Sequence, residues 1–410
     1  MEVRPGYKLT EVGPIPEEWN VHCLAELCSK ITDGTHDTPT PVRSGRPFLT
    51  AIHIRENAID FGNCLYLDET DHRTIFARCN PQRGDVLMVN IGAGVATTAL
   101  VDVDFEFSLK NVALLKPVLA RASGRFLNQS LIARKASITQ ALSSGGAQPF
   151  LSLTEIGQIR IPAPPKSEQE AIADALSDVD ALLGGLDRLI TKKRDLKQAA
   201  MQQLLTGQTH LPGFSGAWEV KRLDEIAEIV SGGTPKTSEP AYWNGGIKWC
   251  TPTDITGCTG KYLIETERTI SRLGLQSSGA RLLPAGALLL CSRATIGEVK
   301  IASGTICTNQ GFKSLVCMPG ESNEFLYYTL LTMKQKMVER AFGSTFLEIS
   351  KANVAALEVN TPSFPEQTAI AAVLSDMDAE LSALEARRDK TRALKQAMMQ
   401  ELLTGRIRLV

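Results

Sequence analysis

The residues best suited to metal or acid–base chemistry are the histidines, and they are scattered along the chain. They are His22, His36, His53, His72 and His210. Only His53 and His72 fall in one segment with an acidic neighbour, Asp71. A zinc site needs several such ligands at short, regular spacing, and this sequence does not offer that spacing. We therefore predict ordinary structural histidines, with no metal site and no catalytic residue.

Other sequence signals of catalysis are incomplete. Gly92-Ala93-Gly94 lacks the third glycine of a dinucleotide-binding loop, and Thr259-Gly260-Lys261-Tyr262 lacks the spacing and last residue of a phosphate-binding loop. Glu-x-Lys occurs at Glu219–Lys221 and Glu298–Lys300, as in some nuclease sites, but without an upstream acidic pair. The Asn/Asp-Pro-Pro-aromatic tetrapeptide of amino-methyltransferases does not occur. We predict a chain that is not an enzyme and binds no cofactor of its own.

The nine cysteines include no Cys-x-x-Cys pair, and most lie in apolar stretches such as the one that ends at Cys291. This pattern is typical of buried, reduced thiols in a cytoplasmic protein. The first residues contain no apolar signal-peptide core, and no apolar run approaches the roughly 20 residues of a membrane helix. We expect a cytoplasmic location and no membrane association.

The elements that must position any functional residue are dominated by an internal repeat. Residues Glu168–Gly207 align without gaps to Glu366–Gly405, and 24 of the 40 positions are identical. Proline precedes both copies, at Pro164-Pro165 and at Pro365, and a glycine ends each copy. These signals predict one long helix per copy, and about 40 residues of helix span about 60 Å. A period near 200 residues indicates two similar large units in tandem.

Apolar residues recur in both helices at alternating spacings of three and four, which is typical of a coiled-coil seam. We predict that the two helices pack on each other through these residues: Ile172, Leu176, Val179, Leu183, Leu186, Leu196, Leu204, Ile370, Leu374, Met377, Leu381, Leu384, Leu394 and Leu402. Lys193 in the first copy and Arg387, Arg388 and Thr391 in the second interrupt the seam. Two unrelated amphipathic helices, each packing on its own domain, are the alternative.

The segments before the helices correspond more faintly, for example Gly34-Thr35 with Gly233-Thr234 and Gly84–Met88 with Gly286–Leu290. Short apolar runs in them predict strands, and longer patterns predict helices over Val21–Lys30, Gly124–Leu142, Arg222–Ile229 and Asn323–Ala341. Ile31–Gly45 and Ser231–Ile247 are expected to be long loops. The predicted fold class is α+β, with two mixed domains at 1–164 and 208–364 and two long helices at 165–207 and 365–410. The last segment includes a C-terminal tail.

The length of 410 residues, with 43% hydrophobic and 22% charged residues, agrees with a folded protein of two or more domains. The formal net charge is −1. Residues 1–165 carry 16 basic and 17 acidic side chains, and residues 207–364 carry 15 and 14. Neither half has the basic excess typical of nucleic-acid-binding domains, so any such surface must be a local cluster.

Four motifs in order resemble the specificity subunit of Type I restriction-modification systems, over essentially the whole chain. The first is Gly6–Trp19, and the second is Ser231–Pro235 followed by Tyr242–Trp249. The third is Ser292–Gly297. The fourth opens each helix with a proline shortly before Glu-Gln-x-Ala-Ile and ends it with Leu-Leu-Thr-Gly. The first half departs from the pattern at Gly34–Pro39 and Ile91–Gly94, as expected if the two halves read different sequences.

The resemblance implies two target-recognition domains that each read one half of a bipartite sequence in double-stranded DNA. It implies that the two helices pack antiparallel, with an internal pseudo-twofold repeat, set the gap between half-sites and dock two modification (adenine methyltransferase) subunits. Motor-nuclease restriction subunits would complete the assembly. S-adenosylmethionine, ATP and Mg²⁺ would be bound by these partner subunits, in the cytoplasm of a prokaryote.

Base reading requires side chains with fixed donor and acceptor patterns, in loops or at strand ends of the matching motifs. The predicted DNA-binding residues of the first half are Thr35, His36, Thr38, Arg43, Asn90, Lys110, Asn111 and Gln148. Those of the second half are Thr234, Lys236, Thr251, Thr253, Arg293, Gln310, Lys313, Ser344 and Thr345. Trp243 and Trp249 are expected to anchor the core rather than stack on bases.

Two other functional classes stay open from the sequence. One is a coiled-coil adaptor that bridges two protein partners without DNA specificity. The other is a stand-alone nuclease or methyltransferase. The DNA target and the half-site gap cannot be read from the residues, because they depend on loop geometry and DNA shape.

Overall fold

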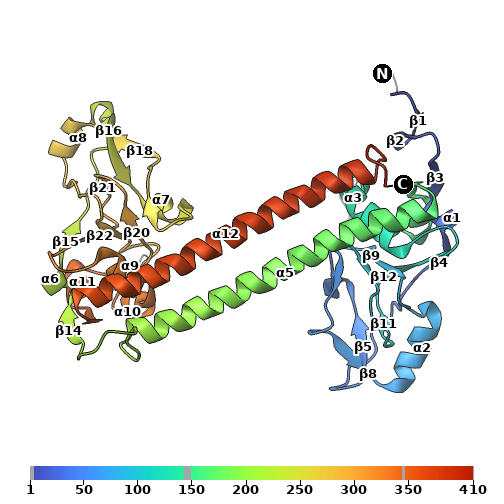
Figure 1. The fold of residues 1–410 in the computed structure, drawn as a ribbon, viewed down its shortest axis with the longest axis horizontal. Coiled ribbons are helices and arrows are strands. Elements are labelled where there is room, and N and C mark those ends of the chain that lie inside the picture. Colours follow the sequence, from blue (N-terminus) through green and yellow to red (C-terminus); the bar gives the residue numbers. More distant parts are fainter. Residues whose placement is uncertain (1–3, 143–148, 344–346, 410) are drawn as a thin grey trace. The chain divides into compact units, whose positions relative to one another are not determined.

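The computed structural model describes residues 4–142, 149–343 and 347–409, and it combines helices and strands as expected (Figure 1). The chain packs into two compact units. Unit 1 contains the residues up to Asp187 together with those from Ala386 onward, and unit 2 contains Arg188–Glu385. Each long helix therefore contributes one part to each unit. No helix in the described part of the chain is both long and apolar enough to cross a membrane.

Unit 1 is built on a four-stranded antiparallel sheet in the order β10-β9-β12-β4. Its strands are β4 (Cys28–Asp33), β9 (Val86–Val89), β10 (Thr98–Leu100) and β12 (Val112–Pro117). Successive residues point to opposite faces, so the sheet separates two cores. Val86 and Met88 pack in one core with Phe126 of α3 (Gly124–Leu142), and Leu87 and Val89 pack in the other.

Smaller elements complete unit 1. A second sheet holds β5 (Arg46–Leu49), β8 (Leu65–Leu67) and β11 (Ser108–Leu109). The paired strands are β1 (Tyr7–Thr10) with β2 (Gly13–Pro16), β3 (Asn20–Cys23) with β13 (Arg160–Ala163), and β6 (Ile54–Arg55) with β7 (Ala58–Ile59). The further helices are α1 (Leu24–Leu27), α2 (Glu69–Cys79), α4 (Leu153–Gln158) and a 3-10 turn at Ala51–His53.

Unit 2 repeats this plan with one more strand, in the order β15-β22-β19-β20-β17. These strands are β15 (Ala227–Ser231), β17 (Tyr262–Leu263), β19 (Leu288–Leu290), β20 (Val299–Ala302) and β22 (Lys313–Cys317). The sheet again separates two cores, because Leu288 and Leu290 pack with Phe325 while Leu289 packs on the opposite face. The shared order of four strands is the structural counterpart of the sequence repeat.

The remaining elements of unit 2 lie around this sheet. The three-stranded sheet holds β16 (Trp243–Cys250), β18 (Arg268–Ile270) and β21 (Cys307–Thr308), and β14 (Glu219–Arg222) pairs with β23 (Glu358–Thr361). The helices are α6 (Leu223–Ile226), α7 (Pro252–Gly257), α8 (Arg272–Gln276), α9 (Asn323–Thr332), α10 (Lys334–Glu339), α11 (Lys351–Ala355) and a 3-10 turn at Pro240–Tyr242.

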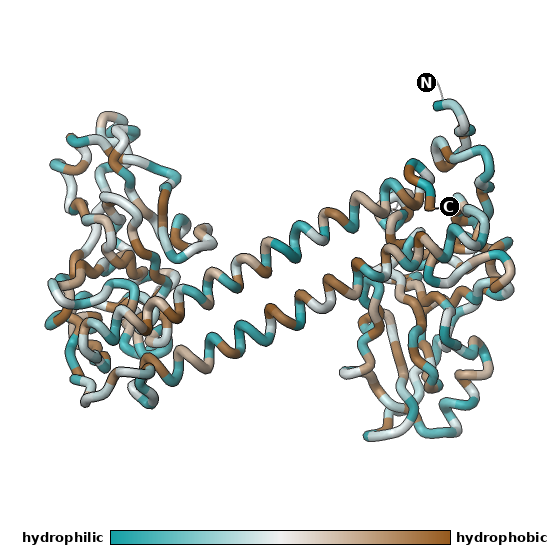
Figure 2. Tube along the Cα trace, in the orientation of Figure 1, coloured by the Kyte–Doolittle hydropathy of each residue, from teal (hydrophilic) through white to brown (hydrophobic). Residues whose placement is uncertain are grey.

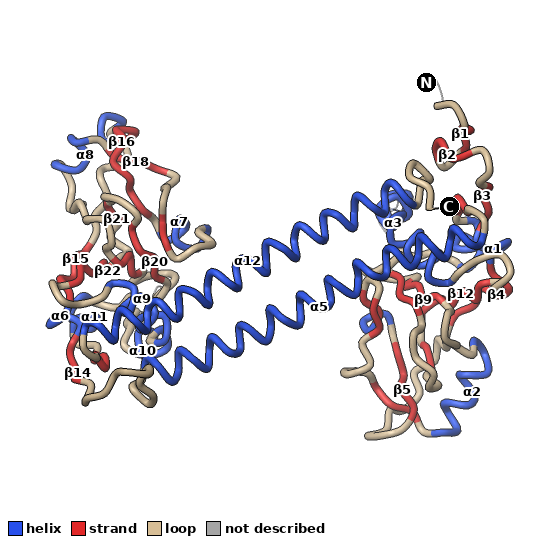
Figure 3. The backbone as a smooth tube through the Cα atoms, in the orientation of Figure 1, coloured by secondary structure: helices blue, strands red, loops and turns tan. Residues whose placement is uncertain are grey.

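The two long helices are α5 (Lys166–Leu205) and α12 (Phe364–Leu402), as the repeat predicts (Figure 3). In unit 1, Asp180 pairs with Lys395 at 2.6 Å, and Asp187 lies 3.9 Å from Arg388. Residue numbers thus rise along α5 while they fall along α12, so the paired segments are antiparallel. Unit 2 shows the same direction, because Lys193 pairs with Glu380 and Lys197 pairs with Asp378.

Most of the predicted seam residues are buried or partly buried, several of them in the cores of the units. Figure 2 shows hydrophobic and hydrophilic residues alternating along both helices. The buried seam residues are Ile172, Leu176, Leu186, Leu204, Ile370, Leu374, Leu381 and Leu402. The partly buried seam residues are Val179, Leu183, Met377 and Leu384.

Two predicted seam residues are wrong. Leu196 and Leu394 are 47% and 55% exposed. The inward positions beside them belong to Lys197 and Lys395, whose side chains are only 19% and 13% exposed. A helix drifts by about 20° per heptad from a strict seven-residue pattern, so a fixed three-four spacing leaves the seam at these residues.

Among the short elements, two predicted helices are wrong. Val21–Lys30 and Arg222–Ile229 each contain only four helical residues, α1 and α6, between two strands. Strand pairing with β13 and β12, or with β23 and β22, overrides the local apolar pattern in these segments. Helix Gly124–Leu142 is confirmed, whereas the helix predicted over Asn323–Ala341 divides at Met333.

Candidate nucleic-acid interface

Five of the predicted DNA-binding residues of unit 1 lie together in one cluster, which we call loop cluster 1: Thr35, His36, Thr38, Lys110 and Asn111. They come from the loop after β4 and from the turn between β11 and β12. The Thr35 segment forms an isolated bridge with Lys110, and Asn111 N donates to Thr35 O over 3.2 Å. Residues separated by about 75 positions in sequence therefore lie together. Thr35 itself is only 7% exposed, which disfavours direct base contact, so the surface is formed by the other four residues.

Side-chain contacts inside loop cluster 1 orient its polar groups. His36 Nδ1 and Asn111 Oδ1 lie 2.8 Å apart, and Lys110 Nζ donates to Thr38 Oγ1. His36 Nε2 also lies 3.1 Å from the buried carboxylate of Asp33. Asn111 has a φ of 52°, a left-handed conformation that asparagine tolerates better than most residues. The cluster thus presents a lysine, an imidazole and an amide, which are donors and acceptors suited to base edges.

Three other predicted residues of the first half lie elsewhere. Arg43 is exposed, and it has no side-chain partner among the residues that the structure describes. Asn90 is only 4% exposed at the end of β9, and its Oδ1 has no hydrogen-bond partner in the described chain. The interior position of Asn90 disfavours direct contact with a base. Gln148 lies outside the described residues.

The corresponding cluster of unit 2, loop cluster 2, contains Thr234 and Gln310. Thr234 Oγ1 donates to Gln310 Oε1, and the preceding Gly233 N donates to Thr308 O over 2.9 Å. These loops follow β15 and precede β22, the places that Thr35 and Lys110 occupy in unit 1. Equivalent turns therefore carry lysine and asparagine in unit 1, and asparagine and glutamine, Asn309 and Gln310, in unit 2.

The other predicted residues of the second half lie in different surroundings. Lys236 and Thr253 are exposed, and Arg293 is partly buried in the loop after β19. Thr251 donates to Asp254 Oδ2 over 2.7 Å at the start of α7. Lys313 is only 7% exposed and lies 3.2 Å from Glu348, so its position in the sheet disfavours base contact. Ser344 and Thr345 lie outside the described residues.

Arg268 is a candidate that the sequence analysis missed. Its guanidinium lies 3.7 Å from the ring centroid of Trp243, and Trp243 and Trp249 meet edge to face. Both tryptophans are buried, which confirms their predicted role as core anchors. Arg268 itself is exposed. A cation held on an aromatic face is already oriented for a phosphate or guanine. The Trp-x5-Trp spacing was the available signal, but strand pairing between β16 and β18 brings Arg268 over it.

The Glu-Gln motif at the start of each long helix connects that helix to its globular domain in both units. Gln169 Oε1 accepts from Ser123 N over 3.0 Å, and Gln367 Oε1 accepts from Ser322 N over 2.8 Å. Each glutamine thereby holds the residue just before α3 or α9. The neighbouring Glu168 is completely buried and pairs with Arg408 at 2.6 Å, and this hydrogen bond raises the pKa of the arginine.

The chemistry available elsewhere is limited. No group of three or more histidine, cysteine or acidic side chains is placed to hold a metal ion within the described ranges. The thiols of Cys28 and Cys317 have pKa values raised to about 12, chiefly by burial, so they are poor nucleophiles. His53 and His72 are buried and hydrogen-bonded to Thr50 and Ser108, respectively.

Comparison with known proteins agrees with the duplicated plan. Residues 16–192 and 216–392 each match the family described as "Type I restriction modification DNA specificity domain". The chain belongs to this family. The first matched segment begins at the end of β2 and runs into α5, and the second begins just before β14 and runs into α12. The repeat found in the sequence is therefore the repeat of the family domain.

Two relatives come from Methanocaldococcus jannaschii. The putative type I restriction enzyme MjaX specificity subunit is 24% identical over 98% of this chain and 97% of that protein. The type I restriction enzyme MjaIX specificity subunit is 38% identical, but over only 39% of this chain and 38% of that protein. The crystal structure of a Type-I restriction-modification system S subunit from M. genitalium covers 98% of this chain and 99% of that one, with a TM-score of 0.62 and 17% identity. At this level of sequence identity, the similarity to the M. genitalium structure shows a shared fold only.

Proposed function

We propose that this chain is the non-catalytic DNA-specificity subunit of a Type I restriction-modification complex. Each unit would read one half of a bipartite target in double-stranded DNA through its loop cluster. The observation that carries the proposal is the pair of equivalent turns with different polar side chains, Lys110-Asn111 in one unit and Asn309-Gln310 in the other. A shared scaffold with different reading groups is what an asymmetric bipartite target requires.

The long helices would set the distance between the two half-sites. Helices of about 40 residues span about 60 Å, which is comparable to one to two turns of B-DNA. Polar pairs along the antiparallel helices would fix their register, as polar residues do at single positions of coiled coils. The adaptor alternative is not favoured, because an adaptor has no need for two loop clusters built from residues far apart in sequence.

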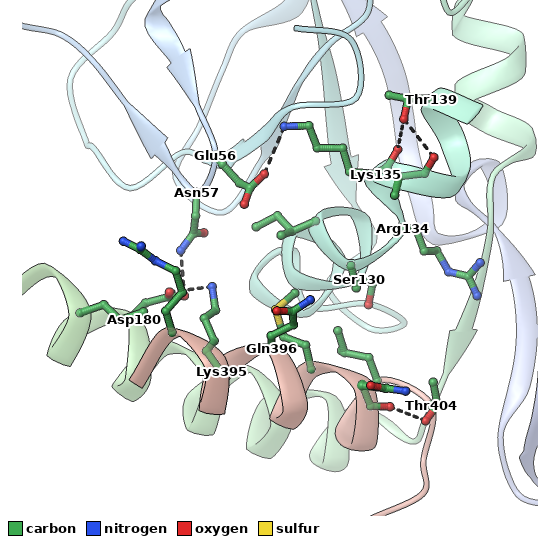
Figure 4. A pocket seen from close by; sticks show the side chains of 18 of the residues that line it. Glu56, Asn57, Ser130, Arg134, Lys135, Thr139, Asp180, Lys395, Gln396 and Thr404 are labelled. Carbon is green, nitrogen blue, oxygen red and sulfur yellow. Dashed lines mark hydrogen bonds and ion pairs between the residues drawn. The ribbon is translucent and has the colours of Figure 1, made fainter. Parts of the chain in front are cut away.

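Modification subunits would dock partly in a groove of unit 1, formed by α3 and both long helices (Figure 4). The groove has a volume of about 960 Å³. Its apolar lining includes Leu183, Met399 and Leu403, and its rim carries more cations than anions. The cations are Arg134, Lys135, Arg392 and Lys395, and the anions are Glu56 and Asp180.

The charge of the groove indicates an acidic occupant. Burial lowers the pKa of Arg134, which has no side-chain partner within the described ranges. Three helical walls suit a fourth helix laid between them. We therefore take the occupant to be an acidic amphipathic helix of a modification subunit. The partner subunits, and not this chain, would bind S-adenosylmethionine, ATP and Mg²⁺ in the cytoplasm of a prokaryote.

The decisive experiment is to express this chain with its modification subunits and to sequence the methylated adenines of the host DNA. The expected result is one bipartite motif with a fixed gap. Exchange of residues 213–364 for another domain of the family should alter one half of the motif only. A change in both halves, or the absence of any sequence-specific methylation, would contradict the proposal.

The near-neutral charge of both halves predicts that the isolated chain binds DNA weakly. Phosphate contacts from Lys and Arg supply most of the non-specific affinity for DNA. In neither half of this chain do Lys and Arg clearly outnumber Asp and Glu. The assembled complex should bind its target more tightly than the chain alone at the same salt concentration. Equal affinities would show that the partners contribute no phosphate contacts.

A further inference from the structure

Two carboxylates on the long helices occupy equivalent positions in the repeat. Asp180 on α5 aligns with Asp378 on α12, and their partners Lys395 and Lys197 align with each other as well. Each pair joins α5 to α12, one pair in unit 1 and the other in unit 2. The duplication has therefore kept both members of the ion pair in both units.

In unit 1, the carboxylate of Asp180 also holds the recognition domain (Figure 4). Its Oδ1 lies 2.6 Å from Lys395 Nζ. Its Oδ2 accepts from Asn57 Nδ2 and from Gln129 Nε2, both over 2.9 Å. Asn57 forms the turn between β6 and β7, and Asn128 Nδ2 donates to Asn57 Oδ1 over 2.6 Å. One side chain thus connects both long helices, α3 and the β6–β7 turn.

In unit 2, Asp378 does the same with different partners. Its Oδ2 accepts from the hydroxyl of Tyr328 on α9 over 2.7 Å, and its Oδ1 pairs with Lys197. Tyr328 follows Ser322 at the same interval as Gln129 follows Ser123. Tyr328 and Gln129, which bind the two aspartates, therefore occupy equivalent positions on α9 and α3. One turn before Asp378, Ser375 accepts from Lys261 over 2.7 Å, beside β17.

We infer that Asp180 and Asp378 are positioning residues that fix the orientation of each recognition domain on the helix pair, and thereby the gap between the half-sites. This inference rests on the proposed function. The apolar cores hold the domains to the helices, but non-directional packing tolerates small shifts. Hydrogen bonds and ion pairs are directional, and buried polar groups specify register in several known helical assemblies.

The partial burial of these groups strengthens the assignment. Asp180 and Lys395 are 22% and 13% exposed, and Asp378 and Lys197 are 33% and 19% exposed. Ion pairs that are fully exposed contribute little, because water screens them. The cross-helix pair Lys193–Glu380 provides the contrast, since it is 30% and 48% exposed and, within the described ranges, joins only the two helices to each other.

The test uses the full complex with its modification subunits and a set of DNA targets. The targets carry the cognate half-sites, separated by the cognate gap or by one or two base pairs more or fewer. The variant Asp378→Asn should raise methylation of the off-gap targets relative to the cognate target by about tenfold, a change that corresponds to about 1.4 kcal/mol. The half-site bases themselves should stay unchanged. Glu380→Gln is the matched control and should keep the gap preference of the wild type.

Tyr328→Phe covers the case in which Asp378→Asn does not fold, because it removes one hydroxyl and leaves the ion pair intact. It should also relax the gap preference, by a smaller factor. Equal loss of methylation on all targets, or an unchanged gap preference in both variants, would overturn the inference. A wild type that methylates no defined motif would instead refute the proposed function, so the two failures are distinguishable.

Discussion

The indole Nε1 of Trp19 donates a hydrogen bond to Glu168 Oε2 over 3.1 Å, at the start of α5. The same buried carboxylate accepts from Arg408 in the C-terminal tail. Unit 2 places His210 at the position of Arg408 in the repeat, 2.8 Å from Glu366. The tail after α12 therefore does in unit 1 what the segment after α5 does in unit 2.

The first prediction concerns this carboxylate. Glu168→Gln should lower the free energy of unfolding of unit 1 by about 2–3 kcal/mol, because it leaves the Arg408 cation without its buried partner. Glu18→Gln is the matched control, since Glu18 also pairs with Arg408 but is 73% exposed. Urea denaturation of the full chain measures both. Equal effects of the two substitutions would show that burial of Glu168 adds nothing.

The second prediction concerns the loop clusters. Lys110→Ala should weaken base discrimination in the first half-site only, and Gln310→Ala should do so in the second half-site only. A lost base contact costs about 1–3 kcal/mol of discrimination. Sequencing of methylated adenines, with the modification subunits present, shows which motif position relaxes. Loss of discrimination in both half-sites from one substitution would contradict independent reading.

The third prediction concerns pH and the buried thiols. Burial raises the pKa of Cys79, Cys291 and Cys307 to about 11, well above the value of about 8.5 for a free thiol. In the unfolded chain these thiols ionise first, so stability is full below about pH 8.5 and falls as the pH rises toward 11. The midpoint of urea denaturation should therefore decrease from pH 8 to pH 10.

The same burial should protect these thiols from modification. A thiol reagent at pH 8 should react with the partly exposed Cys23 and Cys258 before the buried cysteines. Peptide mapping after brief labelling identifies the modified residues. Early labelling of Cys291 or Cys307 would contradict their placement in the core.

The fourth prediction concerns the groove of unit 1. Arg134→Glu should weaken binding of the modification subunits by about tenfold, because it reverses a charge that faces the acidic helix we propose. Arg73→Glu on α2 is the control, an exposed arginine outside the groove. Titration of labelled modification subunit into each variant gives the affinities. An unchanged affinity for Arg134→Glu would place the docking surface elsewhere.

Much of this architecture could be predicted from the sequence, because the internal repeat and its apolar spacing indicate two long helices. Both helices, their antiparallel pairing and the strands around Val86 and Leu288 follow from periodicity or from the resemblance. The exposure of Leu196 and Leu394 was not predicted, because a fixed three-four spacing ignores the drift of the helix, which turns Lys197 and Lys395 inward instead. The predicted DNA-binding residues Asn90 and Lys313 look like loop polar groups in sequence, and only the packed sheets reveal that they are buried.

Loop cluster 1 illustrates what the sequence could suggest and what needed the fold. Residue types suited to base reading pointed to Thr35, Lys110 and Asn111 separately. These three residues lie close together in the fold because β11 pairs in parallel with β5 and β12 lies next to β4. Arg268 was missed because its partner Trp243 lies on another strand, and no local pattern connects them.

The fifth prediction concerns the length of the helix pair. Four residues inserted after Asp187 in α5 and after Glu385 in α12 would lengthen both helices at equivalent positions by about 6 Å. Because ten base pairs of B-DNA span about 34 Å, the gap between half-sites should grow by about two base pairs while the half-site bases stay the same. The methylated motif of cells that carry the variant complex gives the gap directly. The same four residues inserted after Gln208, outside the helices, should leave the gap unchanged, and a constant gap in the helix variant would refute the role of the helices as a spacer.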